Sequence, residues 1–459
     1  MTRRADTGLD ARALEPLQAH FDRECERTID LIEVVGCAIR ARGAGRLLPR
    51  AAKNQRSFAM RRRRLRSRFL ADAWDVISRH EGALASLAGE PGEPGQPGQP
   101  GHPGRLVELT LVGDESHRGG AQPLRLRFEG GSVLLKKGSA GPARLLDVVA
   151  RRVAPDGADL KIPGAIQLDR TWAAFEWIPH RPTVATSAAA DVFYRRFGVA
   201  AAVCWALGVG DRHYENVVAC DGQPVLIDLE DCLGTDVVDW DLYRTMLVPT
   251  PQARTGGVSG IVGEPRKTLG LGFEGAPGNG VVWALPANEA HHRALQPDGR
   301  PWDVSGHLAS LRDGFSMAAE AISSQAMAVE ADACALGSQI ASRRVLRPTA
   351  VYTAFLLELM TPSILGRRQR VGRMAVRLSE LSAVGSHRRV VAGELLDLWR
   401  GDIPWFTTSP QSPRVRHHGG RVVANTSRTG LQALSLRLSL LRDAEFRQRL
   451  ASQLDSLSG

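Results

Sequence analysis

Long hydrophobic runs are missing from this chain of 459 residues. The longest nearly apolar stretch covers residues 197–210, which is shorter than the roughly 20 residues that a membrane-spanning helix needs. The first residues, MTRRADTGLDARALEPLQ, contain no apolar core of a secretory signal. The sequence therefore predicts a cytoplasmic protein without stable membrane insertion.

Cysteine is also scarce, and the six cysteines are scattered without a C-x-x-C pair. This spacing argues against a disulfide framework and against a cysteine-rich zinc site. Acidic residues are fewer than basic ones, 49 against 59, and arginines concentrate in residues 40–68 and 343–389. A basic surface of this kind fits an acidic partner or ordinary solvated helix faces. No RNP-type, zinc-finger or clear helix-turn-helix pattern accompanies the charge, so we expect no nucleic-acid partner.

A repeat of Gly-x-Pro triplets, GEPGEPGQPGQPGHPG, occupies residues 89–104 and is typical of a semi-extended linker. Residues 1–88 before it carry apolar side chains at helical spacing and are predicted to form a helical region. Residues 105–180 after it are rich in strand patterns, whereas residues 181–459 are dominated by helical ones. The sequence therefore predicts an α+β protein with a small β-rich unit and a large helical unit.

A β-hairpin is predicted where PLRLRF and SVLLKK flank the glycines at positions 130 and 131. A further β-rich stretch covers residues 171–178, and residues 188–207 read as a helix. Later helical patterns lie near residues 305–332, 349–361, 369–384 and 429–456.

The most informative stretch is GDRHYENVVACDGQPVLIDLED, residues 210–231. A polar loop is followed by two short apolar strands and then by acidic residues. Asp211 and Asn216 are five positions apart, as are the catalytic Asp and the metal-binding Asn of protein kinases, and Asp228 follows the second strand. Phosphoryl transfer needs hard oxygen ligands for Mg²⁺ and a carboxylate beside the acceptor hydroxyl. The alternative is a polar hairpin whose Asp and Asn only cap turns.

A kinase also needs a cation for the nucleotide phosphates. Lys136, at the end of the predicted hairpin strand, is in the right order relative to Asp211 for that role, although a lysine there could simply solvate an edge strand. There is no GxxxxGK[ST] pattern, which excludes a P-loop, and no G-x-G-x-x-G in the strand region, which argues against an ordinary protein kinase.

Residues 210–231 resemble the G-D-x-H-x-E-N … P-V-L-I-D-L-E signature of the dehydratase domain of class II lanthipeptide synthetases. Further blocks that resemble this family follow its order over about residues 110–410. These blocks are GDESHRG at 113–119, LLKKGS at 134–139, FEW at 175–177, LYRTMLVP at 242–249, VSG at 258–260, RRVLRPT at 343–349 with Tyr352, and GDIPWF at 401–406.

The resemblance implies a two-lobed, lipid-kinase-like fold and ATP- and Mg²⁺-dependent phosphorylation of Ser and Thr in a ribosomally made precursor peptide. Elimination of the phosphate would then leave dehydroalanine or dehydrobutyrine. The residues that it implicates fall into four groups by role: Lys136 on the ATP phosphates, Asn216 and Asp228 on Mg²⁺ with Glu230 supporting the metal site, Asp211 and His213 in phosphorylation, and Arg343 and Thr349 in elimination. A guanidinium suits phosphate through its paired donors.

The sequence also departs from the family pattern. Ser116 stands where the family has histidine, with His117 displaced by one, and Lys137 and Gly138 replace the Pro and Arg that follow the family's lysine. A kinase of a peptide or small molecule without elimination activity is therefore the alternative, and a non-catalytic binding module is a third. No C-H-G or G-H-G motif of the family's cyclase occurs, so we expect a stand-alone dehydratase whose products would need a separate cyclase for ring formation.

Overall fold

The computed structural model describes residues 11–41, 48–89, 105–113, 115–154, 159–237, 240–252, 257–265, 290–360, 365–381 and 388–458. The predicted Gly-x-Pro linker lies outside these residues, apart from Gly89. The helices are α1 (Glu15–Ala41), α2 (Leu48–Ala88), α3 (Gly141–Val153), α4 (Ser187–Leu207), α5 (Leu308–Ser324), α6 (Ala326–Leu336), α7 (Thr349–Met360), α8 (Arg367–Glu380), α9 (Arg388–Arg400), α10 (Gly430–Leu440) and α11 (Ala444–Ser452).

Three antiparallel sheets complete the mixed α+β fold. The first has the order β1-β2-β3-β5-β4, the second the order β11-β10-β9-β8, and the third is the hairpin β6–β7. The strands are β1 (Leu106–Leu111), β2 (Leu124–Phe128), β3 (Gly131–Lys137), β4 (Ala165–Gln167), β5 (Trp172–Glu176), β6 (Val217–Cys220), β7 (Gln223–Leu226), β8 (Ser342–Arg344), β9 (Phe406–Thr408), β10 (Arg414–His417) and β11 (Val422–Asn425).

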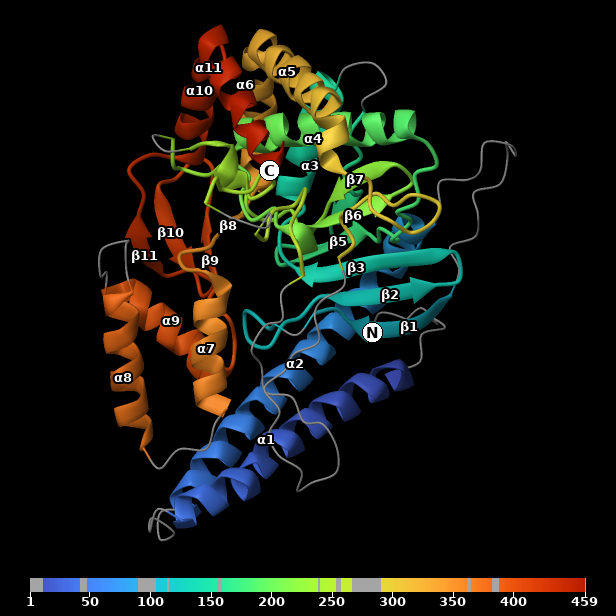
Figure 1. Cartoon of the computed structure of the whole chain (residues 1–459). Coiled ribbons are helices and arrows are strands. Elements are labelled where there is room, and N and C mark those ends of the chain that lie inside the picture. Colours follow the sequence, from blue (N-terminus) through green and yellow to red (C-terminus); the bar gives the residue numbers. More distant parts are fainter. Residues whose placement is uncertain are drawn as a thin grey trace, which may run out of the picture.

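The five-stranded sheet lies between two helical layers, with α1 and α2 on one side and the group around α4 and α5 on the other (Figure 1). Its predicted hairpin is confirmed, because β2 and β3 pair from Phe128 and Gly131 onward. Apolar residues of α1 and α2, among them Phe21, Phe69 and Ile77, share one buried cluster with this sheet. Nearer the start of α2, Phe58 joins a second cluster with α7, α8 and α9. Helix α2 therefore packs against two parts of the molecule that are distant in sequence.

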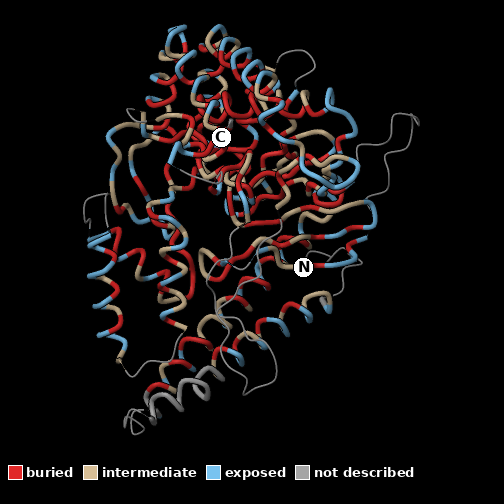
Figure 2. The backbone as a smooth tube through the Cα atoms, in the orientation of Figure 1, coloured by how far each residue is buried: buried red, intermediate tan, exposed pale blue. Residues whose placement is uncertain are grey.

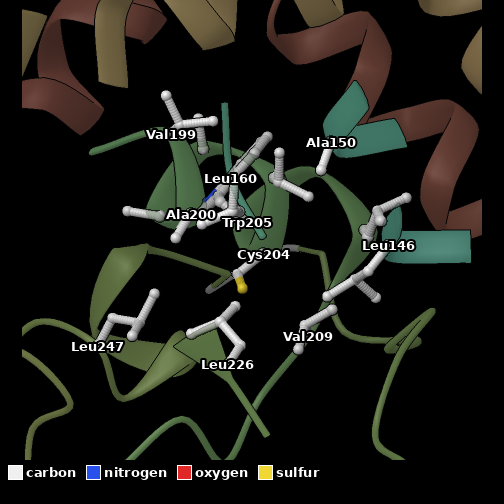
Figure 3. Packing of buried hydrophobic residues seen from close by; sticks show 14 of the residues in the cluster. Leu146, Ala150, Leu160, Val199, Ala200, Cys204, Trp205, Val209, Leu226 and Leu247 are labelled. Carbon is white, nitrogen blue, oxygen red and sulfur yellow. The ribbon is translucent and has the colours of Figure 1, made fainter. Parts of the chain in front are cut away.

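Helix α4 forms the centre of the largest core, and it contains most of the longest apolar run (Figures 2 and 3). A helix that is apolar on all sides needs burial on all sides, and the surrounding helices and the β6–β7 hairpin provide it. The side chain of Thr186 accepts a hydrogen bond from Ala189 N at its start, and Gly208 ends it in the left-handed region, at φ 60°. Among the described residues, no helix is both long and apolar enough to cross a bilayer.

The segments predicted as helical do form helices, but the predicted ends of these helices were less accurate. The stretch predicted near residues 305–332 forms two helices, α5 and α6, which are separated at Gln325. The four-stranded sheet was not predicted, because its strands are only three or four residues long and give little alternation to detect. The region after residue 181 is therefore not purely helical.

A close contact between α4 and α5 gives a testable consequence for stability. A Cβ at Gly198 would lie 2.0 Å from the carbonyl oxygen of Leu311, so Gly198→Ala must push the two helices apart. We expect this variant to lose about 1–3 kcal/mol of unfolding free energy in a denaturant titration. Gly372→Ala, in exposed α8 with open space around the new Cβ, is the control and should gain up to about 1 kcal/mol. Equal stability of Gly198→Ala and the wild type would contradict this packing.

Candidate functional site

A cluster of four charged side chains forms where the three sheets meet, with Lys136, Glu230 and Arg343 buried and Asp228 partly exposed. Lys136 comes from β3, Arg343 from β8, and Asp228 and Glu230 follow β7. Lys136 Nζ donates to Asp228 Oδ1 and lies 3.4 Å from Glu230 Oε2. Arg343 Nη1 donates to Glu230 Oε1 at 2.5 Å, and its backbone N donates to Glu230 O at 2.7 Å. Sequence positions more than 200 residues apart are thus joined in one network of ion pairs.

The network favours the charged forms of Lys136, Arg343 and Asp228. Burial alone would lower the pKa of Lys136 and of Arg343, but the neighbouring carboxylates raise both pKa values above their ordinary range. Burial alone would raise the pKa of Asp228, but Lys136 and then Arg343 hold it well below its ordinary value. Lys136, Arg343 and Asp228 are therefore all charged at neutral pH.

The polar loop before β6 lies beside this cluster. Asn216 ends a short 3₁₀ turn, residues 214–216, and its Nδ2 donates to the backbone O of Asp211 at 2.7 Å. The same Nδ2 lies 3.2 Å from Nε2 of His213, which is itself 3.8 Å from Asp211 Oδ1. Ile227 N donates to Asn216 O at 3.0 Å and extends the β6–β7 ladder, so the hairpin holds Asn216 next to the segment that carries Asp228. Both residues offer hard oxygen atoms, the donor type that suits Mg²⁺.

Arg212 fixes the backbone of both acidic segments. Its fully buried side chain donates from Nε to Gly210 O at 2.8 Å, from Nη1 to Ile227 O at 2.5 Å and from Nη2 to Asp228 O at 2.9 Å. Asp211 and Asp228 both adopt the left-handed region, with φ values of 58° and 55°. Non-glycine residues rarely adopt this conformation, and such strain concentrates at functional sites. Arg212 therefore has a positioning role that the sequence did not indicate, because it stands at the unspecified position of the motif.

A second group of side chains surrounds the ring of Trp405, on the other side of Arg343. The guanidinium carbons of Arg343 and Arg118 lie 4.6 Å and 4.1 Å from the ring centroid, and the His117 ring makes an edge contact at 4.9 Å. Burial and then the charge of Arg343 lower the pKa of His117 to about 3, so its imidazole is neutral at pH 7.

Ser116, at the position of the family's histidine, has a structural role. Ser116 is buried, and its Oγ donates to Asp402 Oδ1 at 2.8 Å. Asp402 also accepts from the backbone N atoms of Gly119 and Gly120, at 2.8 Å and 3.1 Å. Asp402 thereby holds the 116–120 loop and leaves His117, one position later, to contact Trp405.

Thr349 and Glu115 lie at the edge of this group. Thr349 begins α7 and is partly buried, and within the described residues no hydrogen bond or ion pair joins its side chain to the four-residue cluster. Glu115 accepts a 3.5 Å hydrogen bond from Thr353 Oγ1, one turn along α7. Its carboxyl still reaches solvent, but desolvation by the surrounding protein raises its pKa to about 7, against the opposing charge of Arg343. Sequence analysis did not single out Glu115.

The fold and the cluster define a mixed α+β protein with a charged site between its sheets. Residues 94–409 match the model of a family described as a domain of unknown function, DUF4135, and the chain belongs to this family. A comparison with curated proteins found no match.

Proposed function

We propose that the chain is an ATP- and Mg²⁺-dependent Ser/Thr dehydratase that acts on a ribosomally made precursor peptide. The carrying observation is that Lys136, Asp228, Glu230 and Arg343, four residues from three separate blocks of the dehydratase resemblance, are joined in one network of ion pairs. The family match over residues 94–409 covers nearly the same stretch as those blocks.

In the first step the terminal phosphoryl group of ATP moves to a substrate hydroxyl, whose proton must be accepted as ADP leaves. Asp211 would accept or orient that proton, with His213 beside it, and Lys136, supported by Glu230, would bind the nucleotide phosphates. Asn216 and Asp228 would hold Mg²⁺, which neutralises phosphate charge when bound. The oxygen donors of these two residues fit that ion, and the paired backbone around them keeps them close.

In the second step a base removes the α-proton, the electron pair forms the Cα–Cβ double bond, and the Cβ–O bond breaks to release phosphate. Arg343 would stabilise the leaving phosphate, and Thr349 is the second residue that the resemblance assigns to this step. Glu115, which contacts Thr353 one turn along α7 from Thr349, is the candidate for that base. A separate cyclase would add thioether rings to the product.

Nucleotide binding is the first test, because it needs no knowledge of the peptide. ATP with Mg²⁺ at about 100 times its Kd should stabilise the wild type by about 2.7 kcal/mol and raise its Tm. Lys136→Met should lose this ligand-dependent shift. Isothermal titration below the melting temperature checks the result independently of any loss of stability in the variant.

Lys137→Met is the matched control, since Lys137 is the next residue of the same strand and points to Asp72, Phe69 and Trp172 instead. It should keep the wild-type shift. If the wild type binds no nucleotide by either method, the proposal fails and a non-catalytic binding module becomes the better explanation. If both lysine variants lose binding equally, the assignment to Lys136 is wrong.

A further inference from the structure

Next to the backbone of Trp405, two histidines converge on one buried carboxylate, that of Asp397. His417 Nε2 lies 2.8 Å from Asp397 Oδ2, and His418 Nε2 lies 2.9 Å from Asp397 Oδ1. Asp397 is fully buried, and the exposed fractions of the two imidazoles are only 7% and 17%. A carboxylate oxygen of Asp397 and one ring nitrogen from each histidine lie within 4.8 Å of one another.

The backbone is shaped to allow this convergence. Neighbouring side chains of a strand normally point to opposite faces, but β10 ends at His417, where Gly420 N donates to His417 O in a turn. His418 N donates to Trp405 O at 3.2 Å and thereby turns its side chain to the same carboxylate. On α9, Gly393 lies one turn before Asp397, and a Cβ there would come within 3.2 Å of the His417 ring.

The charge balance of this cluster favours a cation. A buried carboxylate needs a compensating positive charge, yet in the described part of the chain no Lys or Arg lies within ion-pair distance of Asp397. The backbone N of Asp402, a second buried acidic residue, donates to Asp397 O at 3.1 Å.

We propose that Asp397, His417 and His418 bind a divalent transition-metal ion, with zinc as the best match. Two imidazole nitrogens and one carboxylate are a ligand set that zinc prefers. Ligand atoms around a tetrahedral zinc ion lie about 3.3 Å apart, so the nitrogen–oxygen separations of 2.8 Å and 2.9 Å need to widen only slightly to admit the ion. Three protein ligands leave the fourth position to a water molecule. Because Trp405 N lies 3.3 Å from Asp397 Oδ2, the ion would fix the segment that supports Arg343 and His117.

Metal content of the full-length chain tests this site. The protein is purified without chelators, incubated with Zn²⁺, dialysed and measured by plasma mass spectrometry. We expect about one zinc ion per chain in the wild type and a loss of at least about tenfold in His418→Gln and in His417→Gln. Co²⁺ in place of Zn²⁺ should give visible absorption bands in the wild type that are missing in both variants.

His307→Gln is the matched control, because His307 is a buried histidine 2.8 Å from Asp191 without a second histidine at that carboxylate. It should keep wild-type metal content. If His417→Gln does not fold, two other measurements test the proposal. These are the metal content of His418→Gln, whose histidine is more exposed, and the effect of a chelator on the wild-type Tm. Metal at background level in the wild type, or wild-type metal content in a folded His418→Gln, would mean that the imidazoles only donate hydrogen bonds and would overturn the proposal.

Discussion

Asp211→Asn is expected to lower the rate of phosphoryl transfer to the precursor peptide by about 10²–10⁴-fold while leaving binding of ATP·Mg²⁺ in place. The amide keeps the size and shape of the carboxylate but cannot accept the hydroxyl proton. Asn also tolerates the left-handed backbone that Asp211 adopts, so the loop should keep its conformation. Asn216 should remain in position as well, because it bonds the main-chain O of residue 211 and not its side chain.

Asp221→Asn is the control for this variant. Asp221 also has a left-handed backbone, at φ 50°, and lies in the turn of the same hairpin, but its exposed side chain pairs with Arg181 at 3.3 Å. Initial rates of phosphate incorporation, measured with excess ATP and the precursor peptide, should be unchanged in this variant. A wild-type rate in Asp211→Asn would remove Asp211 from the mechanism, even if nucleotide binding is intact.

Local patterns predicted the hairpin β2–β3, helix α4 and the two strands β6 and β7 because each has a clear periodicity and turn residues at its ends. The spacing of Asp211, Asn216 and Asp228 could also be recognised in the sequence, because all three flank one hairpin. Helix α3 and the four-stranded sheet were missed. The strands of that sheet are short, and β8 pairs with β9, a strand so distant in the sequence that no local window contains both.

The long-range part of the site was beyond sequence reasoning for a related reason. Residue types alone do not show that Glu230 bonds both Lys136 and Arg343, because the contact depends on how three sheets pack. Trp405 stands in a block that the resemblance includes, but its contacts with Arg343 and His117 appear only in three dimensions. No sequence pattern indicated the role of Arg212, because its side chain donates to main-chain carbonyls.

Arg343→Ala should separate the two proposed half-reactions. If Arg343 stabilises the departing phosphate, its loss should slow elimination by about 10²–10³-fold, the usual effect of removing one charge-stabilising donor. Phosphorylation should continue, so the precursor peptide would accumulate as a phosphopeptide instead of losing one water per modified residue. Mass spectrometry of the peptide after incubation with ATP and Mg²⁺ distinguishes the two products directly.

The ratio of the two products is the informative quantity, because Arg343→Ala also leaves Glu230 without one partner and should lower stability. A general loss of folded protein slows both steps by the same factor, so the ratio is compared at equal consumption of the precursor peptide. Arg343→Lys keeps a cation beside Glu230 but lacks the planar fork of donors, so it should give an intermediate ratio. Arg344→Ala, whose side chain instead bonds Thr408 and the Leu233 carbonyl, should keep the wild-type ratio. If the wild type itself yields only phosphopeptide and Arg343→Ala changes nothing, the chain is a kinase without elimination activity, and the second half of the proposed function is wrong.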